Sequence, residues 1–303
     1  MKSKYPHFFS AGPARDPIFI FNRDSEARAD LRLQIEEMWV KFAPLCADGP
    51  KKFLAEVRNE FNVRAWELYL ACSLIDHGIA LRRAAPAGPD LCFEVPGSGN
   101  GWFEAILANP GDGPDNARLH WAQAGPNLKI AHPQAAHRVL RYANAIVTKH
   151  DKYWKDLRSG RVAEGEPFII AISGASIESA EFQEEIPDFI KAALGIGEAA
   201  IVTAPESPEG ARLVFPPRLS IPRKGRADVP TDLFYVDTFD PISGLLFSPW
   251  SLINLPPTPS DGMRFFHNPF ASAPVPRHTF RFGIEYWVED GLLKHQDWRV
   301  CSR

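Results

Sequence analysis

The chain has 303 residues, of which 45% are apolar and 23% are charged, so its composition excludes intrinsic disorder, a coiled coil and a collagen-like fold. Lys and Arg number 34 against 37 Asp and Glu, a net charge of −3, so any nucleic-acid site must be a local patch. The four cysteines are far apart, and no apolar run is long enough for a signal peptide or a membrane span. We therefore expect a cytoplasmic protein with neither a disulfide framework nor a membrane partner.

The first part of the chain is typical of helices. Apolar residues at helical spacing predict a helix from about residue 25 to Phe42, a second one after Pro50 and a third from about Arg64 to Asp76. In the third helix the charged side chain of Glu67 lies on an otherwise apolar face. The first two helices belong to the expected N-terminal helical segment.

Strand patterns begin after the third helix. Short strands are expected at 79–83, 91–95 and 102–108, the last two as a hairpin. Residues 109–133 contain many Gly and Pro and predict a long loop. A long amphipathic helix is expected at 134–157.

A buried strand follows that helix at 167–172, and a further helix is expected at about 181–194. Beyond it the pattern predicts short strands at 200–203, 212–215, 233–239, 243–248, 263–267 and 279–288. The sequence leaves open whether these late strands join one mixed sheet or form a separate β-rich extension.

Two carboxylates stand on neighbouring predicted strands. Asp90 begins one strand and Glu104 lies in the middle of the next, where Trp102 and Ile106 share its face. A buried carboxylate normally pairs, neutralises or binds a metal. With Glu67 on a helix packed nearby, the oxygens suit Mg²⁺ or Mn²⁺ and metal-assisted phosphodiester hydrolysis.

These residues resemble a known family. Glu67 in a helix, Pro89-Asp90 before one strand and Glu104-Ala105-Ile106 in the next, followed by a helix and a buried strand, look like the PD-(D/E)XK nuclease superfamily, over about residues 62–173. The resemblance implies an α/β fold with a mixed sheet, built on a restriction-endonuclease-like αβββαβ core. It places N-terminal helices at 1–61, the core at 62–198 and a β-rich C-terminal extension of the same domain at 199–303.

The resemblance also implies roles for single residues. Asp90 and Glu104 would bind Mg²⁺ or Mn²⁺, with Glu67 as an auxiliary ligand. The family's lysine, two residues after the glutamate, is replaced here by Ile106. In some members that lysine has moved to the following helix, and the segment from Arg141 to Tyr153 resembles such a helix, which makes Lys149 the candidate catalytic lysine.

Helix geometry separates the two lysines of this segment. With about 100° per residue, Lys149 lies about 80° from the buried direction and Lys152 about 140° from it. We therefore expect Lys149 to reach the sheet edge and Lys152 to be solvated. Arg138, Tyr142 and Lys152 are the expected nucleic-acid contacts along this helix.

A second basic segment lies late in the chain. Its cationic residues, flanked by prolines, are able to contact a polyanion; they are Arg218, Arg223, Lys224 and Arg226.

The favoured hypothesis is a metal-dependent nuclease, with DNA preferred to RNA as the substrate. An alternative is an inactive nuclease-fold protein that binds nucleic acid or a protein, because Ile106 cannot replace a lysine. A third reading makes the carboxylates structural, for example with Glu67 paired to Arg64. The resemblance is also compatible with a homodimer.

Overall fold

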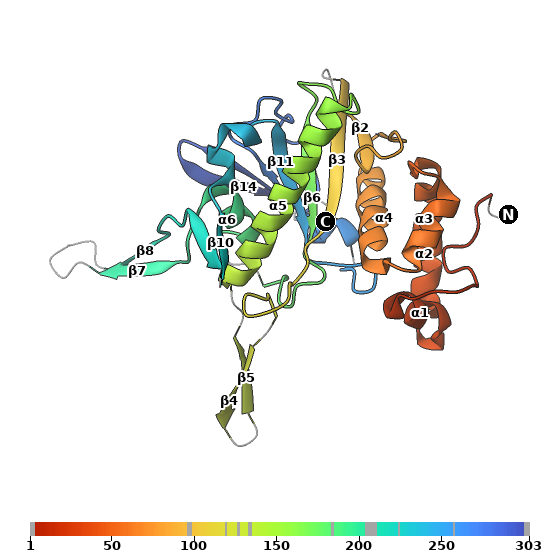
Figure 1. Cartoon of the computed structure of the whole chain (residues 1–303), viewed down its shortest axis with the longest axis horizontal. Helices are drawn as coiled ribbons and strands as arrows, with labels where there is room; N and C mark the ends of the chain where they lie inside the picture. Colours follow the sequence, from red (N-terminus) through yellow and green to blue (C-terminus); the bar gives the residue numbers. More distant parts are fainter. Residues whose placement is uncertain are drawn as a thin grey trace. The chain divides into compact units, whose positions relative to one another are not determined.

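The structure is a computed structural model that describes residues 4–95, 99–118, 120–125, 128–132, 135–182, 185–203, 211–223, 225–256 and 258–299. Two compact units are present. The first contains residues 1–107, 149–175 and 240–303, and the second contains residues 108–148 and 176–239. Figure 1 shows the elements of both units along the chain.

Four helices open the first unit: α1 (Pro17–Asp24), α2 (Ala29–Phe42), α3 (Pro50–Val57) and α4 (Phe61–Asp76). The predictions for α2, α3 and α4 are confirmed, although α2 begins after a 3-10 turn and α4 begins earlier than expected. The sequence analysis missed α1, which has only eight residues. Asp16 caps α1, because its Oδ1 accepts hydrogen bonds from the backbone N–H groups of Ile18 and Phe19 at 2.8 and 3.0 Å.

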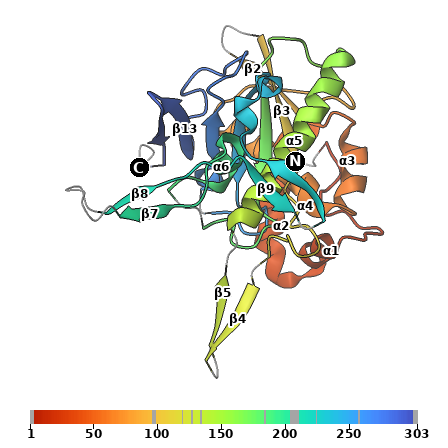
Figure 2. The ribbon, with the colours of Figure 1, turned by 60° about the vertical axis from the view of Figure 1, so that its left-hand side comes forward.

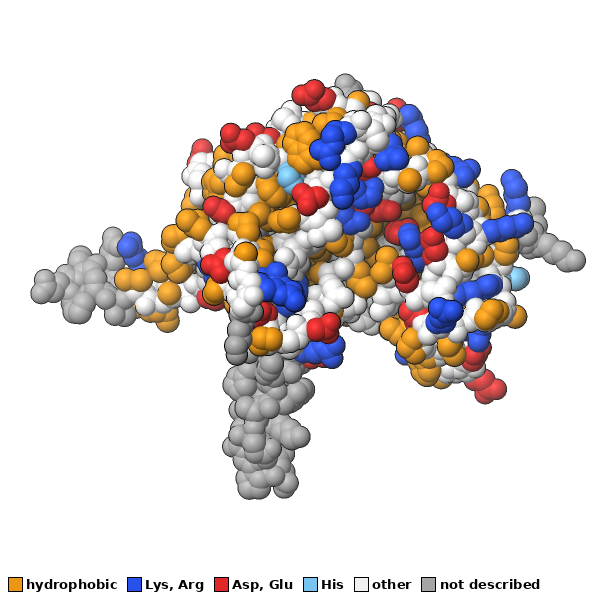
Figure 3. All heavy atoms as spheres, in the orientation of Figure 1, with side chains coloured by type: hydrophobic (Ala, Val, Ile, Leu, Met, Phe, Trp, Pro, Cys, Tyr) orange, Lys and Arg blue, Asp and Glu red, His pale blue; other side chains and the backbone are white. Residues whose placement is uncertain are grey.

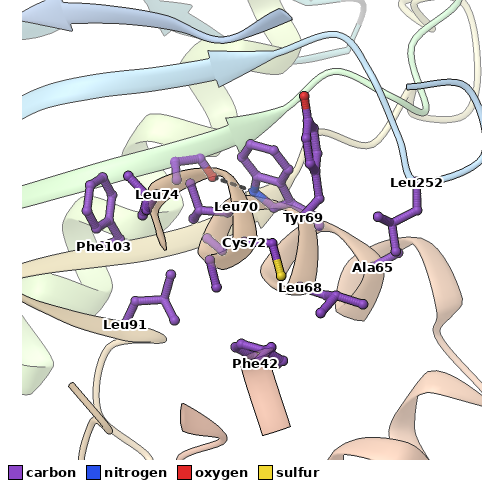
Figure 4. Close-up of a cluster of buried hydrophobic side chains, with 14 of the residues drawn as sticks. Phe42, Ala65, Leu68, Tyr69, Leu70, Cys72, Leu74, Leu91, Phe103 and Leu252 are labelled. Atoms are coloured by element: carbon purple, nitrogen blue, oxygen red, sulfur yellow. Dashed lines mark hydrogen bonds between the residues drawn. The ribbon is translucent and has the colours of Figure 1, made fainter. Parts of the chain in front are cut away.

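Helix α4 is buried along most of its length. It contacts α2 and α3 as well as strand β3 (Gly99–Leu107). Figure 4 shows its side chains packed with others from the sheet, α2 and a late loop, namely Leu91, Phe103, Phe42 and Leu252. Because apolar contacts surround it, a charged residue on α4 needs a partner in the interior.

The first unit contains one mixed sheet of eight strands in the order β1-β2-β3-β6-β11-β12-β13-β14. Strand β3 runs parallel to β6 and β6 parallel to β11, whereas β2 is antiparallel to both β1 and β3. The bounds of the other strands are β1 Leu81–Arg82, β2 Leu91–Val95, β6 Phe168–Ser173, β11 Ile242–Ser248, β12 Arg264–His267, β13 Ile284–Glu289 and β14 Leu292–Asp297.

In chain order, α4, β1, β2, β3, α5 (Ala135–Arg158) and β6 follow the expected order of one helix, three strands, one helix and one strand, but the ribbon of β4 (His120–Gly125) and β5 (Leu128–His132) comes between β3 and α5. The structure also answers the question that the sequence left open: β11 pairs with β6 and brings β11 to β14 into the same sheet, whereas the strands of residues 200–230 form separate two-stranded ribbons. Strand β13 begins at Ile284 rather than at 279, and β14 was not expected. The fold of this unit is therefore mixed α/β with one large mixed sheet.

The two faces of the central strands are covered differently. Phe103, Ala105 and Ala171 pack in the same core as α4. The alternate residues point to the other face, where the C-terminal part of α5 (Ala135–Arg158) lies and the rings of Tyr153 and Phe168 are 5.1 Å apart. A side chain at position 104 therefore faces α5.

The second unit contains the N-terminal part of α5, α6 (Asp188–Leu194) and three two-stranded ribbons. The ribbons, seen in Figure 2, are β4 with β5 (His120–Gly125, Leu128–His132), β7 with β8 (Ala200–Thr203, Ala211–Val214) and β9 with β10 (Ser220–Arg223, Arg226–Pro230). Only the backbone of β4 and β5 is described. Among the described helices, none is long and apolar enough to cross a membrane.

Three expectations for the second unit are wrong. The expected loop 109–133 contains the antiparallel β4–β5 ribbon. The expected strand 233–239 consists of two 3-10 turns, Leu233–Tyr235 and Asp237–Phe239. The helix expected at 181–194 begins only at Asp188, and β9 and β10 were not expected. Residues 183–184 lie outside the described residues.

We predict that one hydrogen bond is important for fixing α4 on the sheet. The indole Nε1 of Trp66 donates to the carbonyl oxygen of Ala171 on β6 at 3.0 Å in the buried core. Trp66→Phe keeps an aromatic ring but leaves that carbonyl without this donor, so the free energy of unfolding should fall by about 2 kcal/mol or more. Urea unfolding measures this difference.

Trp154→Phe is the matched control for this prediction. The Nε1 of Trp154 donates to His150 on the same helix at 2.9 Å, in a half-buried position. A loss of stability in Trp154→Phe as large as that in Trp66→Phe would contradict a special role for the contact between α4 and β6.

Candidate functional site

Asp90 and Glu104 lie side by side. Asp90 directly precedes β2, and Glu104 lies within the neighbouring strand β3. Leu91 is paired with Phe103 in the antiparallel register, so Asp90 stands opposite Glu104. The Cβ atoms of directly opposite residues are about 5 Å apart. In addition, the backbone N–H of Ala105 donates to Oδ2 of Asp90 at 2.7 Å. The register of two strands thus brings together the two carboxylates that the sequence singled out.

Glu104 is almost fully buried and faces two lysines of α5. The amine of Lys149 donates to its Oε1, and Nζ of Lys152 lies 3.2 Å from its Oε2. Burial and the neighbouring charge of Asp90 raise the pKa of Glu104 to about 7, although both lysines act in the opposite direction. Glu104 is therefore a carboxylate whose charge depends on nearby cations.

Lys149 reaches the site from the flank of α5, as helix geometry predicted. Its side chain is only 16% exposed, and its amine meets Glu104 on the face opposite to α4. Ile106, at the position of the family's lysine, is half-buried on the same face of β3. An ammonium group from the helix is thus placed beside the strand that lacks one.

Lys152 is half-buried and bound to neighbouring groups, so the expectation of a solvated lysine is wrong. Its amine donates to the carbonyl oxygen of Gly88 at 3.1 Å and to Asp156 Oδ2 at 2.7 Å, besides the contact with Glu104. Burial lowers the pKa of Lys152, but the carboxylates of Glu104 and Asp156 outweigh it and raise that pKa. The position of Lys152 on the helical wheel predicted exposure, but the loop before Pro89 lies over this part of α5 and supplies the carbonyl of Gly88. Lys152 therefore links α5 to the site and does not serve as an exposed nucleic-acid contact.

Glu67 approaches the same region from α4, on the opposite face of the sheet. Its carboxylate accepts a hydrogen bond from Nη1 of Arg64. Nη2 of the same arginine lies 3.1 Å from Oε2 of Glu56. Burial and the charge of Asp90 raise the pKa of Glu67 well above its ordinary value, despite the opposing effect of Arg64. The pairing with Arg64 is observed, and it leaves Glu67 in electrostatic contact with the other two carboxylates.

Asp90 shares this environment. Burial raises the pKa of Asp90, and the positive charge of Lys149 partly offsets that effect. Three carboxyl groups whose pKa values are all raised form one electrostatically linked set. Such sets are frequent at functional sites, although structural ion-pair networks produce them as well.

A cavity of about 160 Å³ opens beside Glu67 and Asp90. Its lining includes Arg64, the carboxylates of Asp48 and Glu56, and the loop that contains Gly88. The cavity is large enough for several water molecules, because one water takes up about 30 Å³ of liquid. Asp90 therefore has a path to solvent on this side.

The carboxylates near Asp90 offer few protein ligands to a divalent cation. Among the described residues, no three His, Cys, Asp or Glu side chains are arranged to hold a metal ion together. Mg²⁺, however, often takes only one or two carboxylates and keeps several waters. Asp90 and Glu104 are opposed in register, and water has access to Asp90. The pair fits a two-carboxylate site, provided that Lys149 or Lys152 yields an oxygen of Glu104.

Arg138 and Tyr142 are not surface contacts, so both expectations are wrong. Nε of Arg138 donates to Oδ2 of buried Asp188 at 2.6 Å, and its NH1 donates to Ser179 at 3.2 Å. The side chain of Tyr142 is fully buried. The sequence analysis assumed a single buried face on α5, but inside the second unit the helix also buries these positions.

Sequence reasoning missed Asp156 and Arg161. Asp156 is buried and accepts from Lys152, and Arg161 NH1 lies 3.4 Å from the other carboxylate oxygen. The spacing of Lys152 and Asp156, four residues apart on one helix, was a usable signal. That spacing indicates a pair but does not reveal that Glu104 joins it.

Comparisons of the chain with protein-family models, curated proteins and solved structures give no match. The interpretation of the site therefore depends on its residues and their geometry.

We predict that Arg138 is needed for the stability of the second unit. Arg138→Met removes the main cation from the fully buried carboxylate of Asp188, so the free energy of unfolding should fall by about 3 kcal/mol or more. Thermal and urea unfolding measure the loss. Arg118→Met is the control, since Arg118 is exposed and its replacement should change stability by less than about 0.5 kcal/mol. Equal effects of the two substitutions would contradict the structural role of Arg138.

Proposed function

We propose that the protein is a metal-dependent nuclease of the PD-(D/E)XK type, with DNA as the preferred substrate. The observation that carries this proposal is the opposed pair of Asp90 and Glu104 with the amine of Lys149 on Glu104. The element order around the pair supports the resemblance to the restriction-endonuclease-like core. A homodimer, which the resemblance allows, stays a prediction.

Asp90 and Glu104 would hold Mg²⁺ or Mn²⁺. When bound, such an ion supplies Lewis-acid stabilisation of the phosphate and lowers the pKa of a coordinated water. The protein contributes a rigid frame for its ligands, because Asp90 is held by the N–H of Ala105 and Glu104 lies in a strand paired on both sides. Glu67 borders the water-accessible cavity beside Asp90 and would act as an auxiliary ligand through water.

Lys149 would supply the positive group that Ile106 cannot provide. Its amine has Glu104 as the partner in this structure, whereas Lys152 is also bound to Gly88 and Asp156. Lys149 is therefore the lysine with fewer competing contacts. An ammonium group at this point is able to orient a water or to stabilise charge that develops on a phosphate oxygen.

The alternative is an inactive protein of the same fold that binds nucleic acid or another protein. The observation that favours it is the pairing of Glu104 with two lysines, since Oε1 accepts a hydrogen bond from Lys149 and Oε2, which has no hydrogen bond, lies 3.2 Å from Nζ of Lys152. In that case the lysines take the place of a cation permanently. The two proposals differ in whether a divalent cation binds.

We predict Mn²⁺-dependent cleavage of DNA by the wild-type protein. Asp90→Asn and Glu104→Gln should abolish cleavage, because each removes one of the two carboxylates. Lys149→Met should lower the rate about a hundredfold or more. The measurement is cleavage of a labelled duplex in Mn²⁺, with calorimetric titration of Mn²⁺ into each variant.

Lys155→Met is the matched control, because Lys155 is an exposed lysine of the same helix and should leave the rate unchanged. Absence of Mn²⁺ binding to the wild-type protein, with and without DNA, would contradict the nuclease proposal and favour the inactive one. Mn²⁺ binding that persists in Glu104→Gln would place the ion elsewhere.

We also predict a pH-dependent affinity for Mn²⁺. A metal binds the ionised carboxylate, and the pKa of Glu104 is raised to about 7, so protons compete with the ion below that value. The affinity should rise up to about tenfold per pH unit from about pH 5.5 and level off above pH 7. Calorimetry at several pH values measures this profile. An affinity that does not change between pH 5.5 and 7 would show that Glu104 is not a ligand.

A further inference from the structure

Two arginines face each other at the end of the β9–β10 ribbon in the second unit. Arg223 and Arg226 are directly paired in the antiparallel register, and Lys224, which the sequence also singled out, lies outside the described residues. Like charges at directly opposite positions destabilise a ribbon. Arg226 is exposed and Arg223 half-buried, so both are within reach of a ligand from solvent.

A third arginine joins them from α5. Figures 1 and 2 both show the β9–β10 ribbon beside the N-terminal part of this helix. Burial and the positive charges of Arg223 and Arg226 lower the pKa of Arg141, although Asp112 and Asp115 act in the opposite direction. The three guanidinium groups are therefore near enough to repel one another.

Arg141 is held by backbone contacts. Its NH2 donates to the carbonyl oxygen of Asp115. Gly111 lies against the guanidinium, since a Cβ at this position would be 2.4 Å from Arg141 Cζ. The glycine thus permits close approach of the arginine to the loop, and within the described part of the chain the guanidinium binds a backbone carbonyl and no carboxylate.

Two other arginines of the same unit are paired with carboxylates. Arg138 pairs with Asp188, and Arg218 NH2 donates to Glu198 at 2.8 Å. By contrast, Nε of Arg141 and Nε of Arg223 are buried without a hydrogen-bond partner among the described residues. Figure 3 shows Lys and Arg side chains gathered over the lower end of α5 and the neighbouring ribbon. This local charge is the more notable because the whole chain carries a net charge of −3.

We infer that Arg141, Arg223 and Arg226 form an arginine patch that binds the phosphate backbone of a nucleic acid. Guanidinium groups bind phosphate oxygens in a bidentate manner. A two-stranded ribbon is narrow enough to enter the major groove of B-DNA, which is about 12 Å wide. The inference deepens the proposed nuclease function, on which it rests for its choice of nucleic acid as the partner.

The test is binding of a fluorescein-labelled 20-base-pair DNA duplex, measured by anisotropy without divalent cations over a series of salt concentrations. The full-length double variant Arg223→Gln/Arg226→Gln should bind about tenfold or more weakly than the wild-type protein. Its log–log salt slope should be shallower by about 2, because two phosphate contacts are lost. Both residues lie on an accessible ribbon, and circular dichroism checks that the variant is folded.

The matched control is Arg118→Gln/Arg212→Gln, which removes two exposed arginines of the same unit outside the patch. The control should bind like the wild-type protein, apart from a small general charge effect. An equal loss in the control, an unchanged slope in the patch variant or no binding of the duplex by the wild-type protein would overturn the inference.

A second measurement separates this inference from the nuclease proposal. Cleavage of the same duplex in Mn²⁺ is measured for the wild-type protein and for Arg223→Gln/Arg226→Gln, beside their binding data. If the wild-type protein binds DNA through the patch but never cleaves it, the nuclease proposal fails and the patch stands. If it cleaves DNA while the patch variant keeps its affinity and salt slope, the patch fails and the nuclease proposal stands.

Discussion

The buried carboxylate of Glu104 is the constraint on which the candidate site depends. An ionised carboxylate in an apolar strand is stable only with cations beside it, and two lysines of α5 provide them. The same contacts attach the C-terminal part of α5 to the sheet, and Lys152 extends them to the loop before Asp90 through the carbonyl of Gly88. One electrostatic requirement thus positions a strand, a helix and a loop around two opposed carboxylates.

The central sheet explains why the site is rigid. Strand β3 is paired with β2 on one side and with β6 on the other, and α4 packs on the face opposite to α5. The indole of Trp66 also donates to a carbonyl of β6. Because apolar packing surrounds Glu67 and Glu104, their charges are costly and their pKa values rise. The fold therefore creates the electrostatic conditions that a divalent cation or a permanent lysine partner would relieve.

Arginines serve opposite purposes in the second unit. Arg138 is buried with Asp188, and its positive charge is balanced by that carboxylate inside the protein. Arg223 and Arg226 are placed against each other on an accessible ribbon, where their repulsion is not relieved by a bound carboxylate among the described residues. The two arrangements cannot be told apart by residue type or by local spacing. They differ in which segments the chain folds over them.

The sequence by itself determined the helices α2 to α4, the strands β2, β3 and β6, and the candidate carboxylates Glu67, Asp90 and Glu104. These features follow from local periodicity and from the cost of a charge in an apolar segment, which neighbours along the chain are sufficient to reveal. Only the tertiary structure decided which groups Lys152 and Arg138 bind, the formation of the β9–β10 ribbon and the pairing of β11 with β6. Those outcomes depend on contacts between segments far apart in the sequence, and local spacing carries no information about such contacts.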